Sequence, residues 1–200
     1  MMGATLLALL MTGAALPACA ARGQDGADVA AQPTPTLEEM TGQMLLVGFR
    51  GLDAPDGSPV ARAITEEHVA GVVLFDYDTQ LKQPGRNITS PAQLDALTDR
   101  LRALAGRPLI LSVDQEGGRV QRLKERGGFT PSPSAAELGR TGLDTAPTFA
   151  SARALGAQMA EHGLNLDFAP VLDVNVNPES PAIGALGRSF SSDPDIVAAQ

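Results

Sequence analysis

Short, continuous apolar runs alternate with amphipathic stretches along most of the chain. The apolar runs lie at residues 44–49, 72–75 and 108–113 and within residues 164–174. Runs of this length, bounded by polar or glycine residues, are typical of strands that are buried on both faces of a parallel sheet. The pattern therefore predicts an α/β fold whose strands alternate with helices.

Helices are predicted between these strands because apolar residues there recur at spacings of three and four. A short helix is expected to open at Leu37, with Thr36 as N-cap and Glu39 as its capping-box partner. A second helix is expected over residues 59–68, and a third after Ser90-Pro91, with Leu94, Leu97, Leu101 and Leu104 on one face. A fourth is expected through Phe149, Ala152, Leu155 and Met159, ending near Gly163. The last is expected to start at Asp193-Pro194 and to run to Gln200. Three methionines, Met40, Met44 and Met159, are expected to fill gaps in the core.

This order of elements favours the first half of a (β/α)8 TIM barrel. Such a barrel needs roughly 250 residues, so we expect residues 37–200 to supply about its first four β/α units, with the rest beyond residue 200. The alternative is a doubly wound sheet, which predicts a glycine-rich phosphate turn after the first strand. The residues found there, Gly48-Phe49-Arg50-Gly51, do not have that pattern.

The N-terminal segment is expected to direct export. Residues 3–16 form an apolar run that is too short to span a bilayer but typical of a signal-peptide core. We therefore predict a signal peptide over residues 1–19, followed by a flexible tether over residues 20–36. Two processing routes are open: lipidation of Cys19, which anchors the protein in the membrane of the cell envelope, or ordinary cleavage around Ala18-Cys19-Ala20, which leaves a secreted or periplasmic protein.

Charge and composition narrow the function classes. The chain carries 15 Lys and Arg against 23 Asp and Glu, a net charge of −8, which argues against binding to nucleic acid. With one Cys and two His, a thiolate zinc cage is impossible and a site built mainly from histidines is not expected. Aromatic residues make up only 4% of the chain, so any bound sugar must be held mainly by hydrogen bonds.

Polar residues follow the third predicted strand without a spacer. Asp114 is the first polar side chain at the strand's carboxyl end, where the active sites of such barrels lie, and Arg122 lies eight positions further on. A carboxylate there can accept hydrogen bonds from two neighbouring sugar hydroxyls, and an arginine offers five donors in a fixed plane. The alternative is that Asp114 caps the following turn and the arginines form a solvated surface.

The positions of the other polar residues are weaker evidence for a role in the site. Asp173 is expected to end the fourth strand and Asp167 to support the site from within it, whereas Arg188 lies in a glycine-rich loop before the last helix. His68 and His162 fall near helix C-termini, away from the expected site, and are not expected to be catalytic. A metal-dependent lyase built on Asp114, Glu116 and Asp173 is a minor alternative.

Three segments together resemble glycoside hydrolase family 3, and in particular its bacterial β-N-acetylhexosaminidase branch. They are PLILSVDQEGGRVQRL (108–123), LNLDFAPVLDVN (164–175) and IGALGRSFSSDP (183–194). The resemblance implies a barrel enzyme that removes terminal β-linked N-acetylglucosamine with retention of configuration and without a cofactor or metal. It also implies that Asp114, Arg122 and Arg188 bind the sugar.

The family's catalytic residues are expected beyond residue 200. The resemblance implies an Asp nucleophile and an acid/base His that follows a Lys-His-Phe-Pro-Gly-His-Gly segment, and this segment does not occur in residues 1–200. Two function classes remain open: a glycoside hydrolase of which this chain is the N-terminal part, or a non-catalytic envelope lipoprotein that binds sugar without cleaving it. The substrate also remains open between muropeptides, chitin fragments and glycoconjugates.

Overall fold

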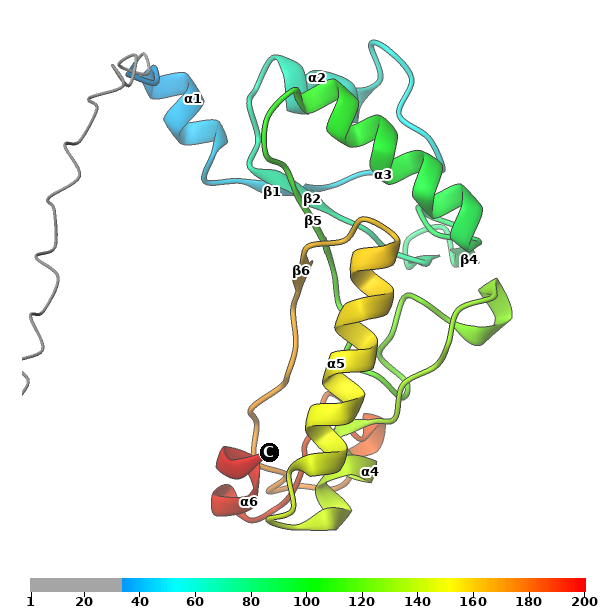
Figure 1. The fold of residues 1–200 in the computed structure, drawn as a ribbon, viewed down its shortest axis with the longest axis vertical. Coiled ribbons are helices and arrows are strands. Elements are labelled where there is room, and N and C mark those ends of the chain that lie inside the picture. The colour runs from blue at the N-terminus through cyan, green and yellow to red at the C-terminus, as the bar shows by residue number, and fades with distance from the viewer. Residues whose placement is uncertain (1–33) are drawn as a thin grey trace, which may run out of the picture. The chain divides into compact units, whose positions relative to one another are not determined.

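The computed structural model describes residues 34–200 (Figure 1). The predicted signal peptide, Cys19 and the predicted tether up to residue 33 lie outside the described residues. Within residues 34–200, no helix has the length and apolar character needed to cross a membrane.

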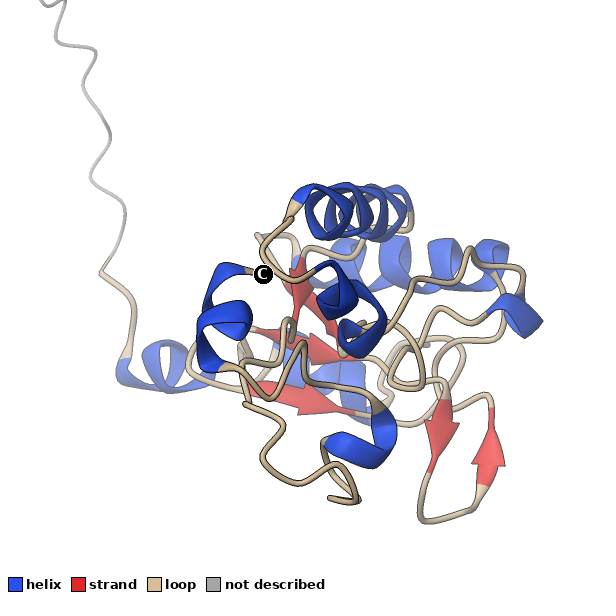
Figure 2. Ribbon diagram, turned by 90° about the horizontal axis from the view of Figure 1, so that it is seen from below, coloured by secondary structure: helices blue, strands red, loops and turns tan. Residues whose placement is uncertain are grey.

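The centre of the described part is a parallel sheet (Figure 2), and its strands lie in the order in which they occur along the chain. Its strands are β1 (Leu46–Gly48), β2 (Gly71–Val73), β5 (Ile110–Val113) and β6 (Leu166–Asp167), and the sheet order is β1-β2-β5-β6. Every neighbouring pair is parallel. The prediction of an α/β fold with a parallel sheet is therefore confirmed, and these strands show none of the reversal of order that a doubly wound sheet requires.

One helix precedes the first strand, one follows the last, and the others occupy the connections between strands (Figure 1). The helices are α1 (Leu37–Gly42), α2 (Pro59–Thr65), α3 (Pro91–Ala105), α4 (Ala135–Leu138), α5 (Ala146–Glu161) and α6 (Pro194–Ala199). The start signals in the sequence are confirmed: Thr36 and Glu39 form the expected capping box of α1, and the side chains of Ser90 and Asp193 cap α3 and α6. The predicted helix over residues 59–68 is shorter than expected, because Glu66 is the C-cap of α2 and His68 has a φ of +53°.

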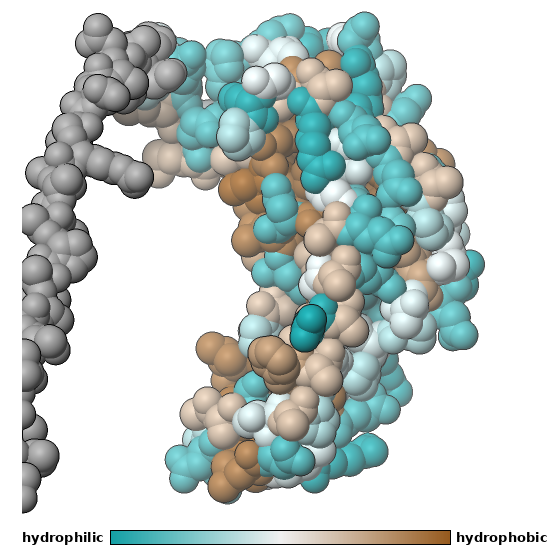
Figure 3. Space-filling model, viewed as in Figure 1, coloured by the Kyte–Doolittle hydropathy of each residue, from teal (hydrophilic) through white to brown (hydrophobic). Residues whose placement is uncertain are grey.

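The first apolar run is less buried than predicted. Met44 is 83% exposed and Leu45 is also exposed, so Met40 and Met44 do not fill the core, whereas Met159 does. Met44 lies in the turn between α1 and β1 and Leu45 directly precedes the strand, and β1 itself pairs only with β2 among the described strands, which leaves its other edge open. Figure 3 shows hydrophobic residues gathered in the hollow beside the sheet.

The first turn of α5 is also more exposed than its apolar spacing suggested. Phe149 is 71% exposed and lines a cavity of about 850 Å³ between α5 and β6, which we call the α5–β6 cavity. Leu155 and Met159, further along the same helix, line the cavity and pack against the core.

The sequence analysis did not anticipate the short antiparallel hairpin of β3 (Tyr77–Asp78) and β4 (Gln83–Pro84), nor the 3-10 helices η1 (Glu125–Gly127), η2 (Gly139–Thr141) and η3 (Gly184–Leu186). Arg50, which follows β1, fixes the hairpin. Its guanidinium forms an ion pair with the buried Asp78 and donates from Nη2 to Gln80 Oε1 at 2.6 Å. The carboxyl ends of β1 and β2 are thereby linked through side chains.

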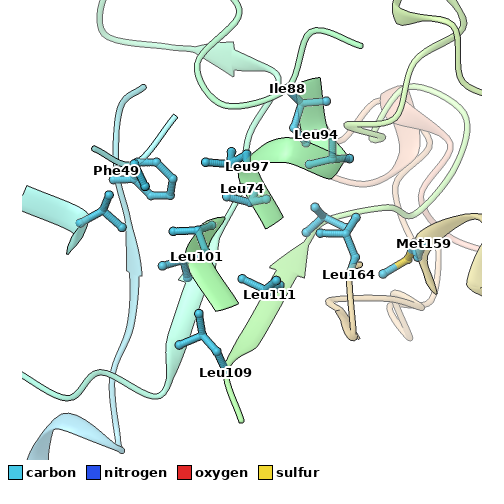
Figure 4. Packing of buried hydrophobic residues seen from close by; sticks show 14 of the residues in the cluster. Phe49, Leu74, Ile88, Leu94, Leu97, Leu101, Leu109, Leu111, Met159 and Leu164 are labelled. Atoms are coloured by element: carbon cyan, nitrogen blue, oxygen red, sulfur yellow. The ribbon is translucent and has the colours of Figure 1, made fainter. Parts of the chain in front are cut away.

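The core lies between the sheet and the helix pair α2 and α3 (Figure 4). Leu94, Leu97 and Leu101 are fully buried on one face of α3, as their spacing predicted, and lie next to Leu74 and Leu111 from the sheet. These leucines fix α3 against β2 and β5, the two central strands, whose carboxyl ends carry the polar residues of interest.

We expect Leu111→Ala to lower the free energy of unfolding by about 3 kcal/mol, because it leaves a cavity in a fully packed position of the central strand. The matched control is Leu143→Ala, at an exposed leucine, which should change stability by less than about 0.5 kcal/mol. Urea unfolding of both variants and the parent protein measures the difference. Equal effects of the two substitutions would contradict this description of the core.

Candidate functional site

One buried amide side chain shapes the loop that follows β5. Gln115 is 1% exposed, and its Oε1 accepts hydrogen bonds from the backbone N–H groups of Arg122 (2.8 Å) and Leu123 (3.0 Å). The chain between these residues must therefore fold back on itself at the carboxyl end of the strand. This return brings Arg122 beside Asp114.

Two glycines make the return possible. Gly117 and Gly118 have φ values of +86° and +57°, which L residues with a side chain rarely adopt. A Cβ at Gly117 would also lie 2.1 Å from the carbonyl oxygen of Pro133, and one at Gly118 would lie 2.5 Å from Ser134 Cβ. Neither position accommodates a side chain without moving the segment that precedes α4.

Asp114 and Arg122, both predicted as site residues, form an ion pair. Arg122 Nη2 donates to Asp114 Oδ2 at 2.6 Å, and the two side chains are 20% (Arg122) and 29% (Asp114) exposed. The Arg122 guanidinium also lies over the Phe75 ring, 5.5 Å from its centroid. The pair is thus held in a fixed geometry but remains accessible from solvent.

Arg188, the third predicted site residue, reaches the same loop through Glu116. Its Nε and Nη2 donate to the two carboxylate oxygens of Glu116, each at 2.7 Å, and its Nη1 donates to the carbonyl of Ala182 at 2.9 Å. This charge pair raises the pKa of Arg188 above its usual value. The sequence analysis considered Glu116 only as a metal ligand, because pairing across 72 positions leaves no local signal.

Asp167 ends β6 and supports the loop from the neighbouring strand. Its Oδ1 accepts the backbone N–H of Gln115 at 2.8 Å, which agrees with the supporting role expected for it. The pKa of Asp167 is raised to about 6, chiefly by burial and also by the negative charges of Asp114 and Glu116, against the opposing effect of the backbone hydrogen bonds. The site therefore contains a carboxyl group that titrates close to neutral pH.

Asp173 was predicted to end the fourth strand, and this prediction is wrong. β6 stops at Asp167, and Asp173 is exposed in the loop beyond it, because the later residues of the apolar run pair with no other strand of the described chain. For the alternative metal site, Asp114 and Glu116 are each engaged by an arginine, and the described residues contain no group of three or more His, Cys, Asp or Glu placed to hold a metal ion.

The two histidines have structural contacts. His162 is the C-cap of α5, and its Nδ1 lies 2.7 Å from Asp95 Oδ1 of α3. The ring of Phe129 meets that of His162 edge-on at 5.3 Å. These contacts of His162 hold the C-terminal end of α5 against α3. His68 lies in the connection between α2 and β2.

A comparison with protein-family models decides the family. Residues 36–200 match the model described as glycosyl hydrolase family 3 N terminal domain. The chain belongs to glycoside hydrolase family 3. The resemblance seen in the three sequence segments is therefore confirmed, and the family match extends over all the helices and strands described above.

The relatives of this family 3 chain carry hexosaminidase names. It is 41% identical over 138 residues to a β-hexosaminidase of Methylobacillus flagellatus, an alignment that covers 66% of this chain and 35% of the relative. A family 3 β-N-acetylglucosaminidase structure from Paenibacillus aligns with a TM-score of 0.72 at 36% identity and covers 83% of this chain and 29% of that one. NagZ of Neisseria gonorrhoeae, solved with N-trifluoroacetyl-D-glucosamine, aligns at 0.64 and 31% identity over 78% of this chain and 42% of that one.

The family 3 chain thus spans less than half the length of each of these relatives. Both structural alignments nevertheless cover more than three quarters of the 200 residues.

The raised pKa of Asp167 predicts a specific effect on stability. Because the folded-state pKa lies above the unfolded value, the folded protein binds the proton more tightly, and this contribution to stability declines as pH rises from about 4 through 6. Asp167→Asn keeps an oxygen to accept the Gln115 N–H but carries no charge. The free energy of unfolding of the variant, compared with that of the parent, should therefore rise by about 1 kcal/mol as the pH is raised from 4 to 7.5. This figure is discounted for solvent screening.

Chemical denaturation of the parent and of Asp167→Asn at both pH values measures this gain. Asp99→Asn, at an exposed carboxylate of α3, is the control and should show the same stability difference from the parent at both pH values. An Asp167→Asn difference that does not change with pH would contradict the pKa assignment.

Proposed function

We propose that the chain forms the N-terminal, sugar-binding part of a β-N-acetylhexosaminidase that removes terminal β-linked N-acetylglucosamine with retention of configuration. The observation that carries this proposal is the Asp114–Arg122 pair, held at the carboxyl end of a central parallel strand and open to solvent. Membership of glycoside hydrolase family 3 and the names of the relatives support it.

The chemistry of the pair suits a hydroxylated ring. Arg122 holds Asp114 Oδ2, so the carboxylate keeps its orientation and presents acceptor positions to vicinal hydroxyls, while the guanidinium offers further donors to a sugar oxygen. Arg188 is proposed as a third sugar contact, oriented by its two-point pair with Glu116. The complex of the Neisseria relative with an N-acylglucosamine analogue supports this ligand class.

We also propose that residues 37–200 form the first four units of a (β/α)8 barrel. The sequential order of the parallel strands, the open edge of β1 and the apolar α5–β6 cavity support this proposal, because a closed barrel requires partners at both ends of the sheet. The greater length of the relatives supports a continuation beyond residue 200.

In the proposed reaction, the residues of this chain bind and orient the sugar. An Asp nucleophile and a His acid/base from the continuation would form a glycosyl-enzyme and hydrolyse it with water, which retains the configuration at the anomeric carbon. Export to the cell envelope, with Cys19 as the lipidated residue, completes the proposal and derives from the sequence alone.

Residues 1–200 alone should not hydrolyse 4-nitrophenyl β-N-acetylglucosaminide, because the proposed nucleophile and acid/base lie outside them. The protein continued to the length of its relatives should hydrolyse it. Release of nitrophenol is measured for both proteins, each with an Asp114→Ala control. Turnover by the 200-residue chain above that of its control would contradict the proposal that the nucleophile and the acid/base lie outside residues 1–200.

In the continued protein, Asp114→Ala should lower kcat/KM by about two orders of magnitude or more. Two hydrogen bonds to a charged group contribute roughly 1.5–3 kcal/mol each, and both are lost. Arg122→Ala acts on the same sugar, so the double variant should lose less than the sum of the two single effects. Asp99→Ala, at an exposed helix carboxylate, is the control and should leave kcat/KM unchanged.

The Tm of Asp114→Ala, measured beside its kinetics, distinguishes a sugar-binding role of Asp114 from a structural one. A purely structural Asp114 predicts a lowered Tm with normal kinetics in the folded enzyme, and this result would remove Asp114 from the sugar site.

A further inference from the structure

The ring of Phe75 carries two arginines. Phe75 follows β2 and is half-buried, and the guanidinium carbons of Arg86 and Arg122 lie over its ring, 4.9 and 5.5 Å from the centroid. Both distances are within the range of a favourable contact between a cation and an aromatic face. Because Arg122 also holds Asp114, the ring links Arg86 to the candidate sugar site.

The backbone of Phe75 is fixed by Asn87. The Phe75 N–H donates to Asn87 Oδ1 at 3.1 Å, and the Asn87 N–H donates to the carbonyl of Phe75 at 2.8 Å. Asn87 is fully buried, and its Nδ2 donates to the carbonyls of Phe49 and Gly51 at 3.3 and 3.0 Å. The ring therefore projects from a backbone that is bound, through Asn87, to the chain that follows β1.

Arg86 confines the ring from the side of β1. Its Nε donates to the carbonyl of Phe49 at 2.9 Å. A Cβ at Gly48, the last residue of β1, would lie 3.2 Å from Arg86 Nη2 and 3.7 Å from Phe75 Cε2. The guanidinium and the ring thus both pack closely against the end of β1, at a position that has no side chain of its own.

The orientation of Arg122 depends on the ring more than that of Arg188 does. Arg188 makes a two-point pair with Glu116, which fixes the plane of its guanidinium. Arg122 reaches its carboxylate through Nη2 alone, and its Nε is buried with no hydrogen-bond partner among the described residues. A buried N–H group without an oxygen acceptor is costly, and the electron-rich face of an aromatic ring offsets part of that cost.

We propose that Phe75 and Arg86 are positioning residues of the sugar site. Arg86 holds the ring of Phe75, and the ring holds the plane of the Arg122 guanidinium, so that Asp114 keeps the orientation in which it accepts sugar hydroxyls. Neither residue needs to touch the sugar. The effect on catalysis rests on the proposed function, whereas the dependence of Arg122 on the ring is a property of this chain.

NMR spectroscopy of the ¹⁵N-labelled chain tests that dependence without any activity. The Nε–H signal of Arg122 is assigned by its absence from Arg122→Lys. A group that lies over an aromatic face is shielded by the ring current, so the signal should move downfield in Phe75→Leu and by a smaller amount in Arg86→Met. Arg100→Met, at an arginine of α3 that pairs with Asp56, is the control and should leave the signal in place.

Kinetics of the continued enzyme test the effect on the sugar site, with 4-nitrophenyl β-N-acetylglucosaminide as the substrate. Phe75→Leu should raise KM about tenfold, the worth of a partly buried contact between a cation and a ring. The kcat should change less than about twofold, because the pair binds the sugar alike before and during the reaction. Phe75→Tyr, which keeps the ring, should restore KM to within about twofold of the parent value.

Two further variants separate positioning from stability. Leu101→Ala, in the buried face of α3, should lower Tm and leave KM unchanged, so a raised KM does not follow from a weakened core. Arg86→Met leaves the ring and the core in place and should raise KM about threefold, which keeps the test available if Phe75→Leu folds poorly. In an Arg122→Ala background, Phe75→Leu should raise KM no further, because it acts through Arg122.

The outcomes distinguish this proposal from the proposed function. Reduced kcat/KM in Asp114→Ala and Arg122→Ala, with normal KM in Phe75→Leu and Arg86→Met, overturns the positioning role and leaves the proposed function standing. If the parent enzyme hydrolyses no substrate, the proposed function fails, and the NMR comparison decides the positioning role. An Arg122 Nε–H signal that is the same in the parent and in Phe75→Leu overturns that role whatever the activity.

Discussion

The carboxyl end of the sheet depends on the contacts of Gln115. Its buried side-chain oxygen receives two backbone N–H groups from the returning loop, and its own backbone N–H is bound by Asp167 of β6. One residue therefore connects the end of β5, the return of the chain and the end of the neighbouring strand. Without the amide, the N–H groups of Arg122 and Leu123 would lose their partner in a place that water reaches poorly, which costs about 1–3 kcal/mol for each buried group.

Charge pairing organises the surroundings of that amide. Four carboxylates each contact at least one Arg or Lys: Asp76 after β2, Asp78 in β3, and Asp114 and Glu116 after β5. The guanidinium groups orient the carboxylates through fixed planar geometry, so the site is arranged before a ligand arrives. Asp167 forms no ion pair with a described Lys or Arg, and its burial, together with two nearby carboxylates, raises its pKa to about 6.

The sequence predicted those features that depend on local periodicity and capping. The leucine spacing of α3, the capping box at Thr36 and the alternation of strands and helices needed only residues that are near one another in the chain. Predictions that depended on where the strands begin and end were wrong: Met44 is exposed in the turn before β1, and Asp173 lies beyond the last strand because β6 pairs over only two residues.

Of the candidate site, the sequence predicted Asp114 and Arg122 because both follow the third strand closely, only eight positions apart. It could not place Glu116 opposite Arg188 or Asp76 opposite Lys124, since 72 and 48 positions separate the partners. Such long-range pairs depend on the register of parallel strands, which brings the residues after β2, β5 and β6 to the same edge of the sheet. The register is a property of the assembled core and leaves no pattern in any single segment.

Arg122 has two simultaneous roles in the candidate site. Its Nη2 holds Asp114 Oδ2, and its guanidinium lies over the Phe75 ring, 5.5 Å from the centroid. The contact with the ring fixes the plane of the guanidinium, and the hydrogen bond then fixes the carboxylate of Asp114 in the orientation proposed for sugar binding. Lysine, with a single point charge on a flexible stem, would lose the planar contact with Phe75, so the orientation of Asp114 would no longer be fixed from this side.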